Sequence, residues 1–257
     1  MKQKIVRLVL GILLFGSIGS STSQAQLPAG QPPAKLFVDP PLAGQLAKGV
    51  VVLPFRTENV RIMPVFGRAA LAVSPRIGHF HLTLDDNSWV WGHFSDQEII
   101  VADLPPGPHK IRIQLVNANH ETLAQEVVKF EIPRRSNTKP EQKAGGKPRA
   151  EEPPAKLIVE APQPDLLKIG VALIRYRTEN LQIAPLFGPA ALAISPRVGH
   201  LHVTLDDAPW HWADASGQPI DVGYLSPGRH KILIELADAN HEVIAREVVR
   251  FEVPAKD

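Results

Sequence analysis

The residues of this 257-residue chain best suited to chemistry are histidines two apart in the sequence. His79 and His81 alternate with apolar residues in GHFHLTLDD, which predicts a half-buried strand with both imidazole rings on one face. Their Cα atoms would then lie about 6.7 Å apart, so two ring nitrogens can bind one metal ion at about 2.1 Å. The spacing therefore predicts part of a metal site.

A third histidine, His120, lies in the turn NANHE, between two segments that we expect to form a hairpin. In an immunoglobulin-like sandwich this turn lies beside the start of the strand that carries His79 and His81, so we expect the three rings to converge. Ligation by imidazoles without sulfur fits copper(II) or zinc, and copper has the higher intrinsic affinity. Only Glu58 is a candidate general base there, so we expect binding and no catalysis.

This arrangement occurs twice, because residues 33–133 recur at 154–254 with a constant offset of 121 and no insertion or deletion. Of the 101 paired positions, 56 are identical, which indicates that each copy is one structural unit. We therefore expect two domains that share no strand, each able to fold alone. The second copy supplies His200, His202 and His241.

Short alternating apolar segments, with turn signals between them and no persuasive helical period, predict an all-β fold. About seven strands per copy favour two tandem immunoglobulin-like antiparallel β-sandwich domains, with a barrel as the alternative. Pro54 is expected to cause a bulge or partial pairing, and 58–77 to form an ordered irregular lid. In the first copy we expect strands near 35–39, 50–57, 78–85, 97–103, 109–116 and 124–132.

The remaining segments complete the expected organisation. Residues 1–25 carry three cations, a short apolar run and then small residues, which is typical of the signal peptide of a periplasmic or secreted bacterial protein. The run is too short to span a membrane, so we expect no membrane association after cleavage. We expect a disordered lead-in at 26–32 and a flexible linker at 134–153, between repeat one (33–133) and repeat two (154–257).

Composition excludes several classes of function. The chain has 28 Lys and Arg against 26 Asp and Glu, and loss of the three cations in the signal peptide leaves 25 against 26. A net charge of −1 gives nucleic acid no basic face. No cysteine is present, so neither disulfides nor thiolate ligands are possible. No hydrolase, phosphate-loop or dinucleotide motif occurs, so we expect no enzyme.

Paired tryptophans provide a different hypothesis, because two indoles on one face can form a platform for sugar rings. The chain would then be a carbohydrate or envelope-polymer binding module. Burial of the indoles against the sheet is the alternative that we favour, and a purely structural interaction module is a third. The pairs are Trp89 and Trp91 in repeat one and Trp210 and Trp212 in repeat two.

Two further histidines are expected to have a structural role. His109 and His230 follow LPPG and LSPG at the start of the first hairpin strand, far from the turn. Sandwich domains often place a side chain there that bonds back to the backbone. We therefore expect both to be corner residues near the opposite end of the domain from the metal site.

A long motif also resembles a known family. RTENVRIMPVFGRAALAVSPRIGHFHLTLDD, followed by Trp-x-Trp, LPPGPHK and ANH, resembles an uncharacterised family of exported bacterial domains, domain of unknown function family 6130. RTENLQIAPLFGPAALAISPRVGHLHVTLDDAPWHWAD in repeat two resembles it more closely. The resemblance covers nearly all of both repeats and implies no known activity. Repeat one departs from it at Val90, Gly92 and His93, where repeat two has His211, Ala213 and Asp214.

Overall fold

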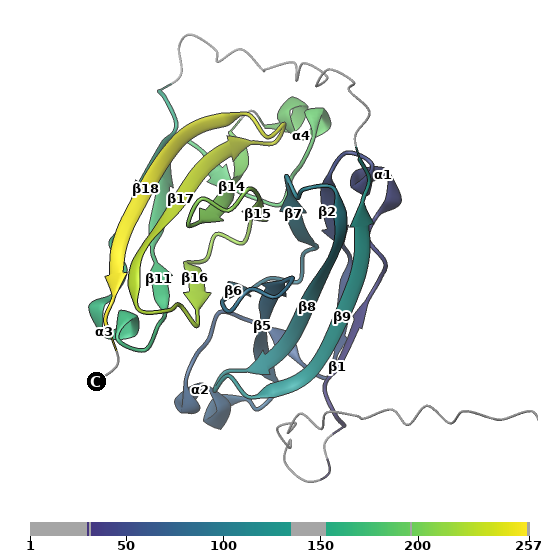
Figure 1. Ribbon diagram of the computed structural model, residues 1–257, viewed down its shortest axis with the longest axis vertical. Coiled ribbons are helices and arrows are strands. Elements are labelled where there is room, and N and C mark those ends of the chain that lie inside the picture. The colour runs from purple at the N-terminus through teal and green to yellow at the C-terminus, as the bar shows by residue number, and fades with distance from the viewer. Residues whose placement is uncertain (1–29, 31, 135–152, 196, 256–257) are drawn as a thin grey trace, which may run out of the picture.

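The computed structural model describes residues 30, 32–134, 153–195 and 197–255 (Figure 1). The predicted signal peptide lies outside the described residues, and so does nearly all of the predicted lead-in and linker. The described chain is nearly all β and consists of antiparallel sheets in two tandem repeats, which confirms the predicted fold class. None of its helices is long and apolar enough to cross a membrane.

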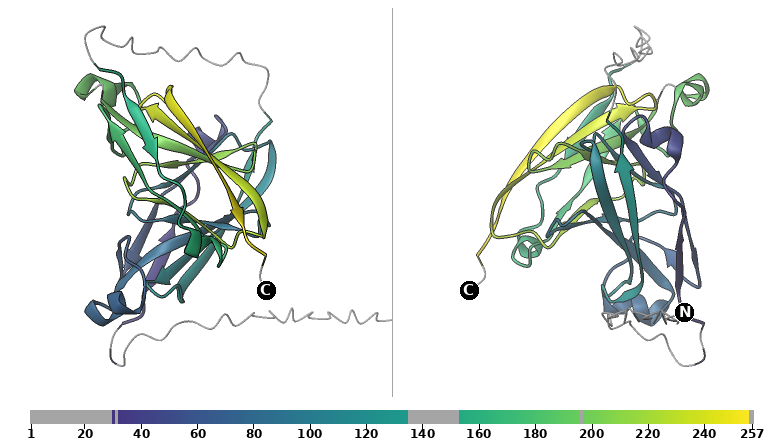
Figure 2. Two further views of the ribbon diagram at one scale, coloured as in Figure 1. Left: turned by 90° about the vertical axis from the view of Figure 1, so that its left-hand side faces the viewer. Right: turned by 45° about the vertical axis from the view of Figure 1, so that its right-hand side comes forward.

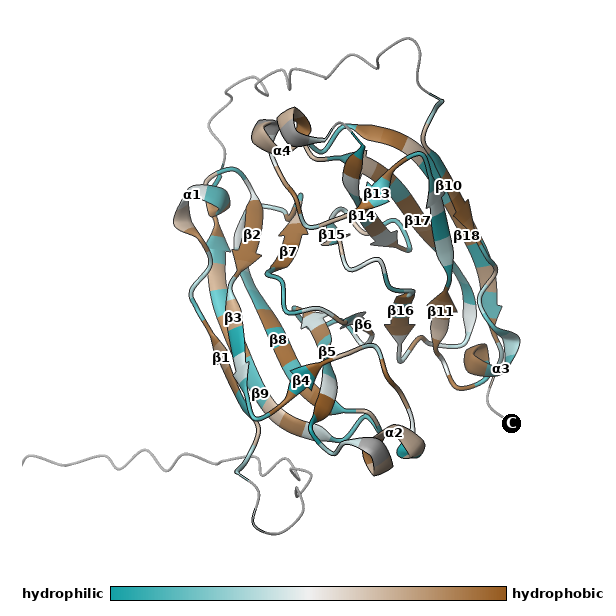
Figure 3. Ribbon diagram, turned by 180° about the vertical axis from the view of Figure 1, so that it is seen from behind, coloured by the Kyte–Doolittle hydropathy of each residue, from teal (hydrophilic) through white to brown (hydrophobic). Residues whose placement is uncertain are grey.

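The elements of repeat one include every predicted strand, and two short helices. In chain order they are β1 (Lys35–Val38), α1 (Ala43–Leu46), β2 (Val50–Leu53), β3 (Phe55–Glu58), β4 (Arg61–Ile62), α2 (Arg68–Val73), β5 (Ile77–Leu84), β6 (Val90–His93), β7 (Ile99–Ala102), β8 (Gly107–Asn117) and β9 (Thr122–Ile132). Apolar and polar residues alternate along the long strands β8 and β9, as Figure 3 shows.

Repeat two has the same elements in the same order. They are β10 (Lys156–Val159), α3 (Pro164–Leu167), β11 (Ala172–Ile174), β12 (Tyr176–Glu179), β13 (Gln182–Ile183), α4 (Pro189–Ile194), β14 (Val198–Leu205), β15 (His211–Asp214), β16 (Ile220–Gly223), β17 (Gly228–Asp238) and β18 (Val243–Val253).

The segment predicted as one strand near 50–57 is two strands that belong to different sheets. β2 pairs with β7, whereas β3 pairs with β1 in a separate two-stranded sheet. Pro54 lies between them and cannot donate to a ladder; its carbonyl accepts a hydrogen bond from the backbone N–H of Asp39 at 2.9 Å. Arg175 separates β11 from β12 in the same way, so the break does not depend on proline alone.

The main feature of the fold is an exchange of strands between the repeats (Figures 1 and 2). One sheet has the order β11-β16-β6-β5-β8-β9, and the other has the order β18-β17-β14-β15-β7-β2. β6 therefore pairs with β16, with Trp91 opposite Val222, and β15 pairs with β7, with Trp212 opposite Val101. The expectation that the repeats share no strand is wrong. β7 and β16 occupy equivalent positions in the two repeats, and so do β6 and β15. Each of β6 and β15 can therefore pair with the β7 or β16 strand of either repeat.

The four tryptophans lie where the repeats cross. The rings of Trp89 and Trp210 stack with centroids 5.6 Å apart, and those of Trp91 and Trp212 also stack at 5.6 Å. Trp91, Trp210 and Trp212 are only 2%, 7% and 3% exposed, and one apolar core continues across both repeats. The sugar-binding hypothesis required exposed indoles, so these buried rings contradict it.

We expect Trp91→Ala to destabilise both repeats together. Removal of a buried indole costs about 3–5 kcal/mol of unfolding free energy, and the shared core should transmit the loss to both sheets. Chemical denaturation followed by far-UV circular dichroism should show one transition at lower denaturant. Val127→Ala, at a side chain that is 46% exposed, is the control and should change little. Two transitions, one of them unchanged, would contradict a shared core.

Candidate metal centre

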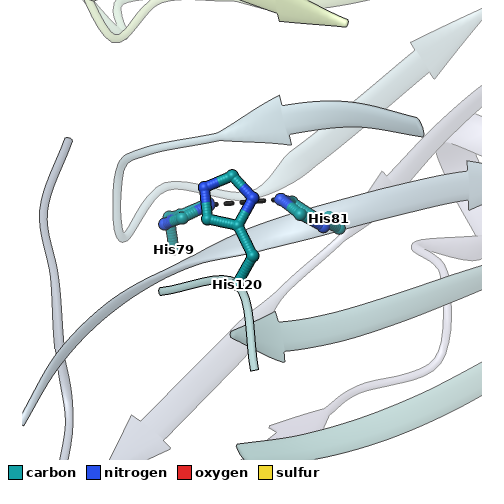
Figure 4. A group of neighbouring side chains, drawn as sticks. All are labelled: His79, His81 and His120. Carbon is teal, nitrogen blue, oxygen red and sulfur yellow. Dashed lines mark hydrogen bonds between the residues drawn. The ribbon is translucent and has the colours of Figure 1, made fainter. Parts of the chain in front are cut away.

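Three histidine side chains converge in each repeat, and in each group the potential ligand nitrogens all lie within 4.8 Å of one another. In repeat one, two of them project from β5 and the third comes from the turn between β8 and β9. Figure 4 shows the rings of His79, His81 and His120 pointing toward one another. We call these groups site one (His79, His81 and His120) and site two (His200, His202 and His241).

The pairing of β5 with β8 brings the turn to the histidines. His79 lies opposite Val116, near the end of β8, so the turn that follows β8 is close to the ring of His79. The neighbouring residue, Gly78, permits this approach, because a Cβ at Gly78 would collide with the carbonyl oxygen of Val116. Repeat two has Gly199 against the carbonyl of Ala237 in the same place.

The turn itself is held by a side chain. The carboxamide oxygen of Asn117 accepts hydrogen bonds from the backbone N–H groups of Asn119 and Glu121, at 2.9 and 3.0 Å. His120 then adopts a left-handed backbone conformation, with φ of 65°, and His241 has φ of 66°. This conformation costs about 1–2 kcal/mol for a residue with a Cβ. The turn in this conformation brings the ring of His120, and that of His241 in repeat two, to the other two histidines.

Site two forms a nearly equilateral triangle of nitrogens. Nε2 of His200 lies 3.0 Å from Nε2 of His202 and 3.0 Å from Nδ1 of His241, and the remaining side is 3.1 Å. A nitrogen of a neutral imidazole is either a donor or an acceptor. At least two of the three nitrogens must therefore both be donors or both be acceptors. Hydrogen bonds consequently cannot form along all three sides of the triangle. A cation can accept all three lone pairs at once.

Site one has the same three residue types, with the two histidines of β5 buried. Nε2 of His79 lies 3.2 Å from Nε2 of His81, and these residues are 0% and 5% exposed. Burial lowers the pKa of His79 to about 2 and that of His81 to about 4, with smaller effects from the neighbouring imidazoles. Burial lowers the pKa of His120 as well. Neutral rings keep the lone pairs that a metal requires.

Acid should destabilise the metal-free protein from just below neutral pH. His79 and His81 have an ordinary pKa of 6.5 in the unfolded chain and lowered pKa values when folded, so protons favour the unfolded state. Each should cost about 1.4 kcal/mol of unfolding free energy per pH unit below 6. Denaturant titrations at pH 7, 6 and 5 test this, with His79→Leu expected to reduce the slope. A constant stability over this range would contradict neutral buried rings.

Aromatic side chains pack against the imidazoles of each site. The centroid of the Phe66 ring lies 5.1 Å from that of His79, and the centroid of the Phe94 ring lies 5.3 Å from that of His79 and 5.4 Å from that of Phe66. Phe66 belongs to the 58–77 segment, which was predicted to be irregular but contains two regular elements, β4, which pairs with β5, and α2. In repeat two, the ring of Phe187 lies 4.8 Å from that of His200. Electrostatic interactions with a bound cation are stronger in such surroundings.

The strand exchange also brings residues of the opposite repeat to each site, which sequence reasoning missed. The ring of Tyr224 lies 6.2 Å from that of His81. At site two, His211 stacks on His202 at 4.3 Å, and its Nδ1 lies 3.3 Å from a carboxylate oxygen of Asp103. Asp103 and Tyr224 occupy equivalent positions in the repeats. Only His211 gave a signal in the sequence, as a polar residue where repeat one has valine.

Glu58 is not available as a general base for site one. Its carboxylate accepts hydrogen bonds from Lys35 and Arg56, both at 2.9 Å. These two hydrogen bonds are the main reason why its pKa is lowered. A carboxylate held in this way is a poor general base.

His109 and His230 lie at the far end of the hairpin from the sites. The Nε2–H of His109 donates to the carbonyl of Pro105 at 2.8 Å, and its Nδ1 lies 2.9 Å from the carboxylate of Asp85. His230 makes the same contacts with Ser226 and Asp206. Both ring nitrogens are engaged, so neither histidine offers a lone pair to a metal. These are the contacts of a structural corner.

We expect His109→Ala to cost stability without affecting metal content. The substitution leaves the Pro105 carbonyl and the Asp85 carboxylate without this partner, which costs about 1–3 kcal/mol of unfolding free energy. Thermal unfolding should shift to lower temperature, while the number of metal ions bound per chain stays the same. A loss of bound metal with unchanged stability would show that His109 is a ligand.

Comparisons with known proteins identify a family and no activity. A family model described as "Family of unknown function (DUF6130)" matches residues 17–144 and again residues 141–257. No curated protein matches the chain. One similar solved structure is a "Crystal structure of tetra-tandem repeat in extending region of large adhesion protein", with a TM-score of 0.25 and 9% identity. The match covers 86% of this chain and 49% of that chain, so this chain spans about half its length.

Proposed function

The chain belongs to the family of unknown function DUF6130, with one copy of its domain in each repeat, and from this premise we propose a non-enzymatic metal-binding protein. Site one and site two would each hold one zinc or copper(II) ion. The composition of residues 1–25 supports a periplasmic or secreted location for this role.

The nitrogen triangle of site two is the observation that carries the proposal. Metal–nitrogen bonds of about 2.05 Å in tetrahedral geometry place the ligand nitrogens about 3.3 Å apart. The three nitrogens of site two lie 3.0 to 3.1 Å apart, so small movements outward would fit them to an ion. Hydrogen bonds cannot form along all three sides of such a triangle of nitrogens, whereas a cation can accept a lone pair from each of them.

The ligand set favours particular metals. Imidazole ligands suit zinc and copper, and the absence of cysteine disfavours copper(I) and iron–sulfur centres. Three protein ligands leave one coordination position open. A binding role is supported over turnover because Glu58, the one candidate base from the sequence, is held by two cations.

Metal titration of the full chain tests the proposal. The purified protein is stripped of metal and dialysed against zinc and, separately, against copper(II), and bound metal is measured by elemental analysis. We expect saturation at two ions per chain for the preferred metal. A purely structural interaction module would bind no metal above the level of the double variant His81→Ala/His202→Ala, and that result would overturn the proposal.

A further inference from the structure

A tyrosine of repeat two reaches site one in repeat one. Tyr224 directly follows β16, which pairs with β6, with Gly223 opposite Val90 (Figure 1). The centroid of the Tyr224 ring lies 6.2 Å from that of His81, with the two planes at 85°, which is an edge-to-face contact. The strand exchange therefore places a phenol against one of the three imidazoles.

The strand register explains how Tyr224 comes to His81. Gly92 lies opposite His81 on β6, and Val90 lies two residues before Gly92, so these three residues project from one face of the sheet. Gly223, opposite Val90, has no side chain on that face. The backbone of Tyr224 is left-handed, with φ of 60°, so the chain turns out of the strand at this residue. The ring of Tyr224 then contacts His81 directly.

Site two has a different pair of residues in the same place. His211, which is equivalent to Val90, stacks on His202 at 4.3 Å. Its Nδ1 lies 3.3 Å from a carboxylate oxygen of Asp103, which is equivalent to Tyr224 and has a similar φ of 62°. In each site a further polar ring thus packs against the second histidine of the strand. That ring is an imidazole at site two and a phenol at site one.

The phenol of Tyr224 is available to bind an ion. Tyr224 is 60% exposed, and its hydroxyl makes no hydrogen bond with the residues that the structure describes. Exposed side chains change rotamer rapidly, so packing does not fix the direction of the oxygen. His81, in contrast, is 5% exposed and is held in place. The oxygen can therefore move to an ion that the imidazoles hold.

We propose that the phenol oxygen of Tyr224 occupies the open fourth position of the metal ion in site one, and that this ion is copper(II). This inference rests on the proposed function. The ring already contacts His81, so a change of side-chain rotamer brings its oxygen to the ion. The phenol gives its proton to the solvent as the oxygen–copper bond forms, and no electron is transferred. The phenolate offsets part of the charge that three neutral imidazoles leave on the ion.

The added oxygen makes the two sites unequal. Three nitrogens and one oxygen are a mixed ligand set that suits copper(II) in tetragonal geometry. At site two, Asp103 stands in the position of Tyr224 and lies beside His211. We therefore expect a phenolate complex of copper(II) at site one and copper(II) bound without a phenolate at site two.

Copper(II) titration of one site at a time tests this assignment. His202→Ala disables site two and His81→Ala disables site one, both in the full chain. A phenolate bound to copper(II) gives a ligand-to-metal charge-transfer band in the visible spectrum, and imidazole ligands alone do not. We expect this band in copper-loaded His202→Ala and not in copper-loaded His81→Ala.

The two tyrosines of the chain provide a variant and its matched control. Tyr224→Phe keeps the ring and removes the oxygen. In the His202→Ala background it should abolish the band and weaken copper(II) binding by at least about tenfold, measured by competition with a chelator. Tyr176→Phe introduces the residue that repeat one has at this position, Phe55, and should leave both the band and the affinity unchanged.

The outcomes separate this inference from the proposed function. If copper(II) binds at site one without the band, or if the band persists in Tyr224→Phe, the role of Tyr224 is overturned and the metal site stands. Loss of the band in Tyr176→Phe as well, with an altered far-UV circular dichroism spectrum, would show a structural effect and also overturn it. Binding of zinc but not copper(II) by His202→Ala would overturn it too. If this variant remains folded and binds neither metal, the metal function of site one fails, and this inference fails with it.

Discussion

The variant His81→Ala is expected to lose one of two bound metal ions, and His81→Ala combined with His202→Ala is expected to lose both. Each substitution removes a buried ligand nitrogen, 3.2 Å from its neighbour in site one or 3.0 Å in site two. The loss of metal affinity should exceed about 100-fold, which is the largest effect expected from substituting a residue that contacts only the ligands and not the metal. Dialysis followed by elemental analysis measures it directly.

His93→Ala is the matched control for this prediction. His93 is also a histidine of repeat one, but its Nε2 lies 3.0 Å from the carbonyl oxygen of Gln97 and outside the cluster. Its removal should leave two metal ions per chain. Retention of both ions by the double variant, or their loss in His93→Ala, would contradict the ligand assignment.

Repeat two expressed alone, as residues 152–257, is expected to have no folded monomeric state. Within the full chain, β15 pairs with β7 and β16 pairs with β6. Separation leaves both strand edges unpaired and exposes the buried faces of Trp210 and Trp212, which otherwise stack on the indoles of repeat one. Unpaired edges of this kind favour unfolding or association. Circular dichroism and light scattering after size exclusion measure both.

A full chain with a protease site in the linker is the control for the separated repeat. After cleavage, the two halves should remain together, because sheet pairing and the shared core join them. A folded monomer of residues 152–257 with a cooperative transition would contradict the importance of the exchange. Halves that separate after cleavage under native conditions would contradict it independently.

Strand parity and neighbour rules were sufficient to predict the histidine geometry. The alternation around His79 and His81 fixed their common face, and the pairing of β5 with β8 brought His120 to them. Both rules act over a few residues and one strand contact. This local character explains why the prediction succeeded from one sequence.

The strand exchange could not be predicted in the same way. The alternation of apolar and polar residues shows which side chains of a strand face the core. It does not show whether β7 or β16, which have similar sequences, is the neighbouring strand. β6 was missed because Trp89 and Trp91 follow a turn, and the two indoles were considered as buried side chains or as a sugar platform without being assigned to a strand.

X-ray absorption spectroscopy of the zinc-loaded chain tests the central claim most directly. The two histidine clusters predict a first shell with about three nitrogens at 2.0–2.1 Å, accompanied by the outer-shell scattering of imidazole rings. The signal should correspond to two ions per chain and disappear in His81→Ala/His202→Ala. A first shell of oxygens without imidazole scattering, or zinc that is retained by the double variant, would show that the clusters are not metal sites.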